Sequence, residues 1–308
     1  MKNKKMTAAV AAFVLTVITV AVRFLFLKNN VEPATLFVNF GSNHTALAIG
    51  VAAVGFLCFG ILYASGDKDS VILHRTVSGT AVRAASVIFA VAFAVLFVYA
   101  VADFGAASAT EKMPASMVRI IVVTKVLLLV SSALGAVYFI MLAAGKCGRA
   151  VGFLSNFPSL WFTIALLRYF IETAAYVNLF GRSLFIAVYA VCAFALMYEA
   201  RLTVYPNSFP KVKKETEKDG NDTDEKTDDD DEENDKNSIV KHRVYAALAG
   251  TSAFALAVKA VPELLVLGEG FAFRENYAYY LCEVIGIVYF AVRAFTAVGV
   301  KPETDTEE

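Results

Sequence analysis

The chain contains few of the residues that build metal centres or disulfide frameworks. Its four cysteines stand singly, with no CxxC spacing, and its three histidines fall in three different loops without a second ligand nearby. Zinc sites and disulfide-rich scaffolds both need these residues at short, regular spacing. We therefore expect no metal and no cofactor, and we interpret the cysteines as small apolar side chains within the fold.

Catalytic signatures are equally scarce. The sequence contains no GxxxxGK[ST] phosphate loop, no HExxH and no GxSxG, and the one aspartate close to a long apolar stretch, Asp103, lies at its end. An enzyme is therefore disfavoured. Nucleic-acid binding is disfavoured too, because the one long polar segment is acidic and would repel phosphate.

Charge is sparse, whereas apolar residues are abundant. Only 18% of the residues are charged and 58% are hydrophobic, an excess too large for an ordinary soluble domain. The apolar residues gather in stretches of about 18 to 25 residues, the length that a helix needs to cross a hydrocarbon layer of about 30 Å. The sequence predicts an all-α fold, a polytopic transmembrane helical bundle in the lipid bilayer of a bacterial plasma membrane.

Eight stretches have this length. The first follows three lysines and lacks a small-residue cleavage site, so we interpret it as a retained span and not as a removed signal peptide. The predicted spans are 6–27, 45–65, 84–101, 120–144, 158–177, 183–202, 245–267 and 277–298.

Lysine and arginine fall unequally on the two sides of these spans. When sides alternate along the chain, one side carries sixteen of them and the other six, and cytoplasmic loops carry such an excess. We predict that both termini are cytoplasmic. Arg293 counts toward the cytoplasmic side and Arg23 toward the other, and Glu199 is expected at the cytoplasmic interface.

One segment between the sixth and seventh spans differs from the rest in composition. Residues 211–240, together with the tail 301–308, hold 17 of the 28 acidic residues and 7 of the 28 basic ones. The segment lacks aromatic residues and cannot bury enough apolar surface to offset the entropy of ordering. We predict a disordered acidic cytoplasmic linker between a six-span part, 1–210, and a two-span part, 241–300.

Ionisable residues inside spans are the most informative feature, because each costs about 2.5 to 3.5 kcal/mol at a helix centre and is usually paired or functional. Arg168 is predicted about 15 Å deep, at the midplane, with Glu172 one turn away on the same helix face. Lys259 and Glu263 repeat this spacing around Pro262. Because proline lacks an N–H, it should free carbonyl groups for a cavity, water or a ligand.

The predicted topology brings these charges together. The fifth and seventh spans are predicted to run outward, and the fourth and eighth inward. These directions would place five of the charges in the outer half of the membrane, above Arg168, in one polar cluster. The predicted cluster comprises Arg168, Glu172, Lys259, Glu263, Glu283 and Lys125. The alternative is structural: the lysines reach the membrane surface, and Arg168 with Glu172 fixes helix packing.

Two functions fit these features. In the first, the protein is a transporter, a permease component or a small-ligand receptor, in which Arg168 binds an anionic or zwitterionic group of a small polar ligand and the carboxylates bind a cation or protons. In the second, it is a non-catalytic membrane scaffold or accessory subunit. Its acidic segment, residues 215–236, would then dock a cytoplasmic protein partner.

Overall fold

The computed structural model describes most of the chain, with short gaps between the described ranges. These ranges are 2–39, 41–65, 79–105, 115–146, 149–173, 182–204, 228–271 and 277–299.

Helices make up nearly all of the described chain. In order they are α1 (Lys2–Asn30), α2 (His44–Ser65), α4 (Thr80–Gly105), α5 (Ala115–Ala143), α6 (Arg149–Leu154), α7 (Asn156–Thr173), α8 (Arg182–Val204), α9 (Asp228–Val266), the short 3-10 helix η2 (Leu267–Glu269) and α10 (Tyr277–Gly299). The isolated antiparallel bridge within the described residues joins Val31 to Val38, between α1 and α2. The predicted all-α fold is confirmed.

Eight helices of the described chain are long and apolar enough to cross a membrane. A helix satisfies its own backbone N–H and C=O groups, which is necessary where the surroundings contain no water. Each predicted span overlaps one of these helices, although the fifth apolar span begins at Ala150 and not at Pro158. The predicted number of spans is confirmed, and the architecture is that of a multi-pass membrane protein.

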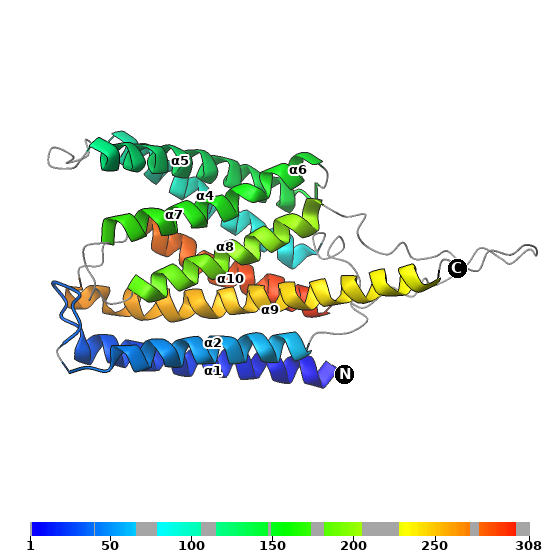
Figure 1. Ribbon diagram of the computed structural model, residues 1–308, viewed down its shortest axis with the longest axis horizontal. Helices are drawn as coiled ribbons and strands as arrows, with labels where there is room; N and C mark the ends of the chain where they lie inside the picture. The colour runs from blue at the N-terminus through cyan, green and yellow to red at the C-terminus, as the bar shows by residue number, and fades with distance from the viewer. Residues whose placement is uncertain are drawn as a thin grey trace, which may run out of the picture.

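Six of the helices form a closed ring. α4 packs against α5, α5 against α7, α7 against α8, α8 against α9 and α9 against α10, and α10 packs back against α4. α1 and α2 pack against each other and, outside the ring, against α9, as Figure 1 shows. α9 is therefore the helix that joins the outer pair to the ring.

Aromatic side chains fill the interior of this ring. The Phe89 ring of α4 lies 4.6 Å from the Phe139 ring of α5 and 4.7 Å from the Tyr289 ring of α10, measured between centroids. Trp161 of α7 lies 5.8 Å from Phe93 of α4 in the same way. All five side chains are almost completely buried, and aromatic pairs of this kind contribute to packing beyond the area they bury. The ring therefore encloses a packed core along this part of its length.

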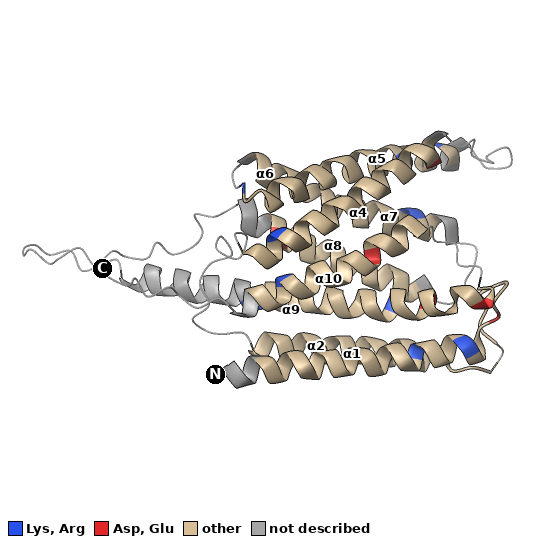
Figure 2. Cartoon of the chain, turned by 180° about the vertical axis from the view of Figure 1, so that it is seen from behind, with Lys and Arg blue, Asp and Glu red and all other residues tan. Residues whose placement is uncertain are grey.

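The outward faces of the helices carry large apolar side chains. Phe13 of α1, Phe56 of α2 and Phe153 of α6 are all more than half exposed. Such a surface would be unfavourable in water, whereas in a bilayer the surrounding lipid tails are as apolar as the side chains. Along the coloured parts of the helices in Figure 2, few residues are charged.

The two ends of the bundle are distinguished by the direction of the helices. We call the end where α1 begins the proximal end and the opposite end the distal end. Because helix direction alternates, α4, α7 and α9 finish at the distal end, and α5, α8 and α10 begin there (Figure 1). The orientation predicted from the sequence makes the proximal end cytoplasmic.

The last two membrane helices are central to the packing. α9 contacts α1, α2, α8 and α10, and α10 also contacts α4. The acidic segment between 211 and 240 therefore separates two parts of the sequence, but the helices on either side of it pack into one bundle.

α9 also extends into the acidic segment. It begins at Asp228, so residues 228–240 are helical where the sequence predicted a disordered linker, and residues 211–227 and the tail 301–308 lie outside the described residues. Two physical effects favour this extension. A helix that continues from a membrane span needs no new nucleation, and acidic residues at a helix N-terminus interact favourably with the helix dipole.

Candidate functional site

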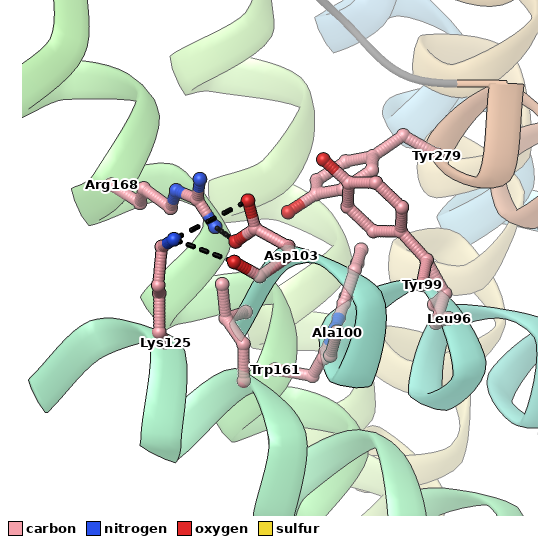
Figure 3. Close-up of a pocket in the computed structure, with 9 residues that line it drawn as sticks. Leu96, Tyr99, Ala100, Asp103, Lys125, Trp161, Arg168 and Tyr279 are labelled. Atoms are coloured by element: carbon pink, nitrogen blue, oxygen red, sulfur yellow. Dashed lines mark hydrogen bonds and ion pairs between the residues drawn. The ribbon is translucent and has the colours of Figure 1, made fainter. Parts of the chain in front are cut away.

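Three charged side chains from three helices meet at the distal end. Arg168 Nη1 of α7 donates to Asp103 Oδ2 in the last turn of α4 at 2.8 Å. Lys125 Nζ of α5 lies 3.5 Å from Asp103 Oδ1 and donates to the backbone carbonyl oxygen of Asp103 at 2.7 Å. Figure 3 shows both basic side chains reaching Asp103. We call these three residues the distal cluster, and its two bases and one acid leave a formal charge of one positive.

A small pocket, with room for about one water molecule, lies beside the distal cluster. Its wall includes Tyr99 of α4, Trp161 of α7 and Tyr279 of α10, and the Tyr279 ring lies 5.9 Å from that of Tyr99 and 5.3 Å from that of Trp161. The hydroxyl groups of both tyrosines point toward Asp103 in Figure 3. Asp103 and Arg168 are 18% and 17% exposed. Charged and aromatic groups from four helices thus converge on a pocket that the surface can reach.

A second polar group lies where α1 packs against α9. Pro262 stands inside α9 and, having no N–H, leaves the carbonyl oxygen of Val258 without its helical partner. Arg23 of α1 replaces that donor, because its Nη1 donates to Val258 O at 2.7 Å and to Lys259 O at 2.5 Å. The sequence predicted that a cavity, water or a ligand would take the freed carbonyl groups. In the structure, a side chain from another span takes them.

The same arginine belongs to a set of four buried charges. Arg23 Nη2 forms an ion pair with Glu263 Oε1. Lys259 Nζ lies 3.3 Å from Glu263 Oε2 and 2.8 Å from Glu283 Oε1 of α10. We call Arg23, Lys259, Glu263 and Glu283 the distal network. Its two bases balance its two acids, as expected for charges that pair inside a membrane protein.

Aromatic residues surround the distal network. Tyr189 of α8 donates its hydroxyl to Glu283 Oε1 at 2.8 Å, and Tyr280 of α10 donates to Glu263 Oε2 at 3.1 Å. The Lys259 ammonium also lies 5.1 Å from the centroid of the Tyr280 ring, within the range of a cation–π contact. Every charge of this network is therefore paired and enclosed by protein.

A third polar group lies toward the proximal end. Glu199 of α8 accepts hydrogen bonds from the hydroxyl groups of Tyr138 at 3.2 Å, Tyr245 at 2.7 Å and Tyr289 at 2.7 Å, and it pairs with Arg293 Nη2 at 2.6 Å. Glu199 and Arg293 are each only 1% exposed. We call these five residues, from α5, α8, α9 and α10, the proximal network. Glu199 lies near the end of its apolar span, Ser183–Ala200, as expected, but it is buried there because three other helices supply donors to it.

The structure divides the predicted polar cluster into two parts. Lys259, Glu263 and Glu283 come together, and the i, i+4 pair of Lys259 and Glu263 is an ion pair. Lys125 and Arg168 lie in the distal cluster instead. The side chain of Glu172 lies outside the described residues, so its pairing with Arg168 stays a prediction.

Arg168 was predicted at the membrane midplane, and in the structure it pairs with Asp103 in the last turn of α4. The apolar span that contains it runs from Ala150 to Ile171, which puts Arg168 close to the distal end of the span. The cause is the earlier start of the fifth span, since Pro158 does not begin it but lies in the first turn of α7, where proline is tolerated.

Sequence reasoning missed several polar partners. It placed Asp103 at the end of a span and counted Arg23 among the bases of the non-cytoplasmic side. In the structure, Arg23 is 1% exposed and forms an ion pair. A signal existed for Arg23, because it interrupts an apolar run before the end of that run. No local signal existed for the tyrosines of the proximal network, since 46 to 90 residues separate them from Glu199.

Within the described residues, no group of three or more His, Cys, Asp or Glu side chains is arranged to hold a metal ion. Three cysteines, Cys58, Cys192 and Cys282, are free and buried, which agrees with their interpretation as small apolar side chains. Cys147 lies outside the described residues.

No protein-family model, curated protein or solved structure matches the chain. Its function has to be argued from the polar groups of the eight-span bundle.

Proposed function

We propose that the protein binds a small anionic or zwitterionic solute at the distal cluster, where the small pocket marks the point of access, as a transporter, permease component or small-ligand receptor of the plasma membrane. The observation that supports this function is the convergence of Lys125 and Arg168 on Asp103 at the wall of a pocket. Two bases facing one acid favour a solute with a negative group. The role is one of binding and not of catalysis.

The lining of the pocket indicates how such a solute would bind. The planar guanidinium group of Arg168 matches carboxylate or phosphate oxygens, and the Lys125 ammonium adds a compact charge. A solute oxyanion would compete with Asp103 for these two donors. The aromatic rings beside them suit an apolar or cationic part of the same molecule.

The test is to purify the full-length protein from native membranes and to identify bound small molecules by mass spectrometry. We expect a molecule with an anionic group in the wild-type protein and its loss in Arg168→Ala. Lys28→Ala is the matched control, because Lys28 is also a distal base but pairs with Glu269 at 2.8 Å on the surface.

Either of two results would contradict the proposed function. One is that no anionic or zwitterionic molecule is recovered with the wild-type protein. The other is that Arg168→Ala, eluting as a folded protein, retains the same molecule in the same amount.

A second candidate function is that of a non-catalytic scaffold or accessory subunit. The observation that favours it is the length of α9. This helix starts at Asp228, whereas its apolar span starts at Arg243. Figure 1 shows the first turns of α9 extending past the neighbouring helices. An acidic helix of this kind suits a partner with a basic surface. Deleting residues 215–236 should release such a partner and leave the bundle intact, and retention of every co-purifying protein would exclude this role.

A further inference from the structure

Lys259 is held between two carboxylates of the distal network. Its Nζ lies 2.8 Å from Glu283 Oε1 and 3.3 Å from Glu263 Oε2. Arg23 contacts Glu263 as well. Among the described residues, Glu283 contacts one base, Lys259, and shares it with Glu263, whereas Glu263 contacts two bases. If Glu283 were neutral, both Lys259 and Arg23 would still contact a carboxylate.

The other buried acids lack this property. Neutralising Glu263 would break its ion pair with Arg23. Neutralising Glu199 would leave Arg293 beside no carboxylate in the described part of the chain. A buried base that loses its acid is strongly unfavourable, so neutralising either acid would weaken the ion pair of its arginine.

We propose that Glu283 is an intramembrane proton-binding site of the bundle. A proton from the aqueous phase adds to one carboxylate oxygen of Glu283, so one O–H bond forms and no other covalent bond changes. The distal network then passes from formally neutral to one positive charge. Lys259 keeps its proton and pairs with Glu263, and the second oxygen of Glu283 still accepts the hydrogen bond from Tyr189.

The groups around Glu283 come from each helix packed against α10. α9 contributes charges, α8 contributes neutral donors, and α4 faces α10 with aromatic rings such as Phe89, 4.7 Å from Tyr289. The titratable groups in contact or electrostatic reach are Lys259 and Glu263 of α9, Tyr189 and Cys192 of α8, and Cys282 of α10. Of these, Lys259 is the single base, and it is shared with Glu263.

Glu283 also lies next to the proposed solute pocket. Tyr279, a lining residue, precedes it by four residues on α10, so both side chains lie on one helix face. Tyr189, the donor to Glu283, packs with its ring 6.2 Å from that of Trp161, another lining residue. A negative solute group in the pocket would offset the charge that the proton adds. This coupling of proton and solute rests on the proposed function, whereas the proton site does not.

Infrared difference spectroscopy of the full-length protein in lipid bilayers tests the site. As the pH is lowered from about 9 to about 4, which covers ordinary and strongly perturbed carboxyl groups, we expect the carbonyl band of a buried protonated carboxyl group to appear. The band should be lost in Glu283→Gln and kept, at a shifted frequency, in Glu283→Asp. Glu269→Gln, at an exposed distal acid, is the matched control and should leave the band unchanged.

The site is overturned if the wild-type protein shows no such band in this range or if Glu283→Gln retains it. Should the glutamine variant not fold, Glu283→Asp decides, because an unshifted band would place the proton on another residue. Arg168→Ala separates this inference from the proposed function, since that variant should lose the solute and keep the band. A band without any retained solute removes the proposed function alone, and retained solute without the band removes the proton site alone.

Discussion

The proximal network and the distal cluster use similar chemistry in different surroundings. In each, one carboxylate pairs with residues on other helices. Glu199 in the proximal network is 1% exposed and receives three tyrosine hydroxyl groups and an arginine. Asp103 in the distal cluster is 18% exposed, faces two bases and borders a pocket. The first group encloses its carboxylate, and the second leaves its carboxylate partly exposed.

This difference separates packing from binding. A fully enclosed ion pair contributes strongly only while both partners are present, because the loss of one leaves a buried charge alone. A partly exposed pair is hydrated and exchanges partners at lower cost. We therefore expect substitutions in the proximal network to affect stability most, and substitutions in the distal cluster to affect solute binding more than stability.

Arg293→Met should have the largest effect on stability. It removes the base that pairs with the buried Glu199, so we expect a loss of about 3 to 5 kcal/mol in the free energy of unfolding, measured by thermal or denaturant unfolding in detergent. The double variant Glu199→Gln, Arg293→Met should recover much of this loss because it removes the uncompensated charge. A loss no greater than that of a surface variant would end the distinction between the two regions.

Arg23→Met should follow, in the distal network. Val258 O and Lys259 O would lose their arginine donor, but Glu263 would keep Lys259 and the Tyr280 hydroxyl. We expect a loss of about 1.5 to 3 kcal/mol, the range for hydrogen bonds to charged groups, in the same unfolding measurement. If Arg23→Met proved as harmful as Arg293→Met, the remaining partners of Glu263 would not compensate.

Asp103→Asn should cost about 1 kcal/mol of stability, since asparagine keeps the shape and one acceptor. It should also strengthen retention of an anionic solute roughly tenfold, corresponding to about 1.4 kcal/mol, because Lys125 and Arg168 would no longer face a competing carboxylate. Titration of the solute recovered with the wild-type protein measures this. A loss of binding like that of Arg168→Ala would instead mean that Asp103 itself contacts the solute.

Lys28→Ala should have the smallest effect and sets the scale for the others. Lys28 and Glu269 form an ion pair at the distal end in which the side chains are 50% and 41% exposed. Pairs of this kind contribute about 0.2 to 1 kcal/mol, and salt screens them. Unfolding at low and high salt should show a small difference that shrinks as salt is added. A large, salt-independent loss would show that exposure does not rank these ion pairs.

Some of this arrangement was accessible from sequence because it depends on local properties. The length and hydropathy of each stretch predict a span, and eight such helices are present in the described chain. The pairing of Lys259 with Glu263 was also accessible, because residues four apart face each other on any helix. Pro262 predicted unsatisfied carbonyl groups for the same local reason.

Other parts were not accessible because they join distant segments. Arg168 and Asp103 are 65 residues apart, and Arg23 and Val258 are 235 residues apart. Hydropathy indicates that each helix is apolar enough to cross a membrane, but it does not say which spans are neighbours. For that reason one predicted polar cluster became two groups, and Glu199 was not recognised as buried.

The sequence by itself thus determined that this is an all-helical chain with eight apolar spans, since helix formation and membrane transfer act on each segment separately. Only the tertiary structure decided that six helices close into a ring, that Arg23 from α1 occupies the carbonyl groups freed by Pro262, and that Arg168 faces Asp103 at a pocket. These partnerships depend on the order in which helices pack around one another, and that order is set by contacts between segments far apart in the chain.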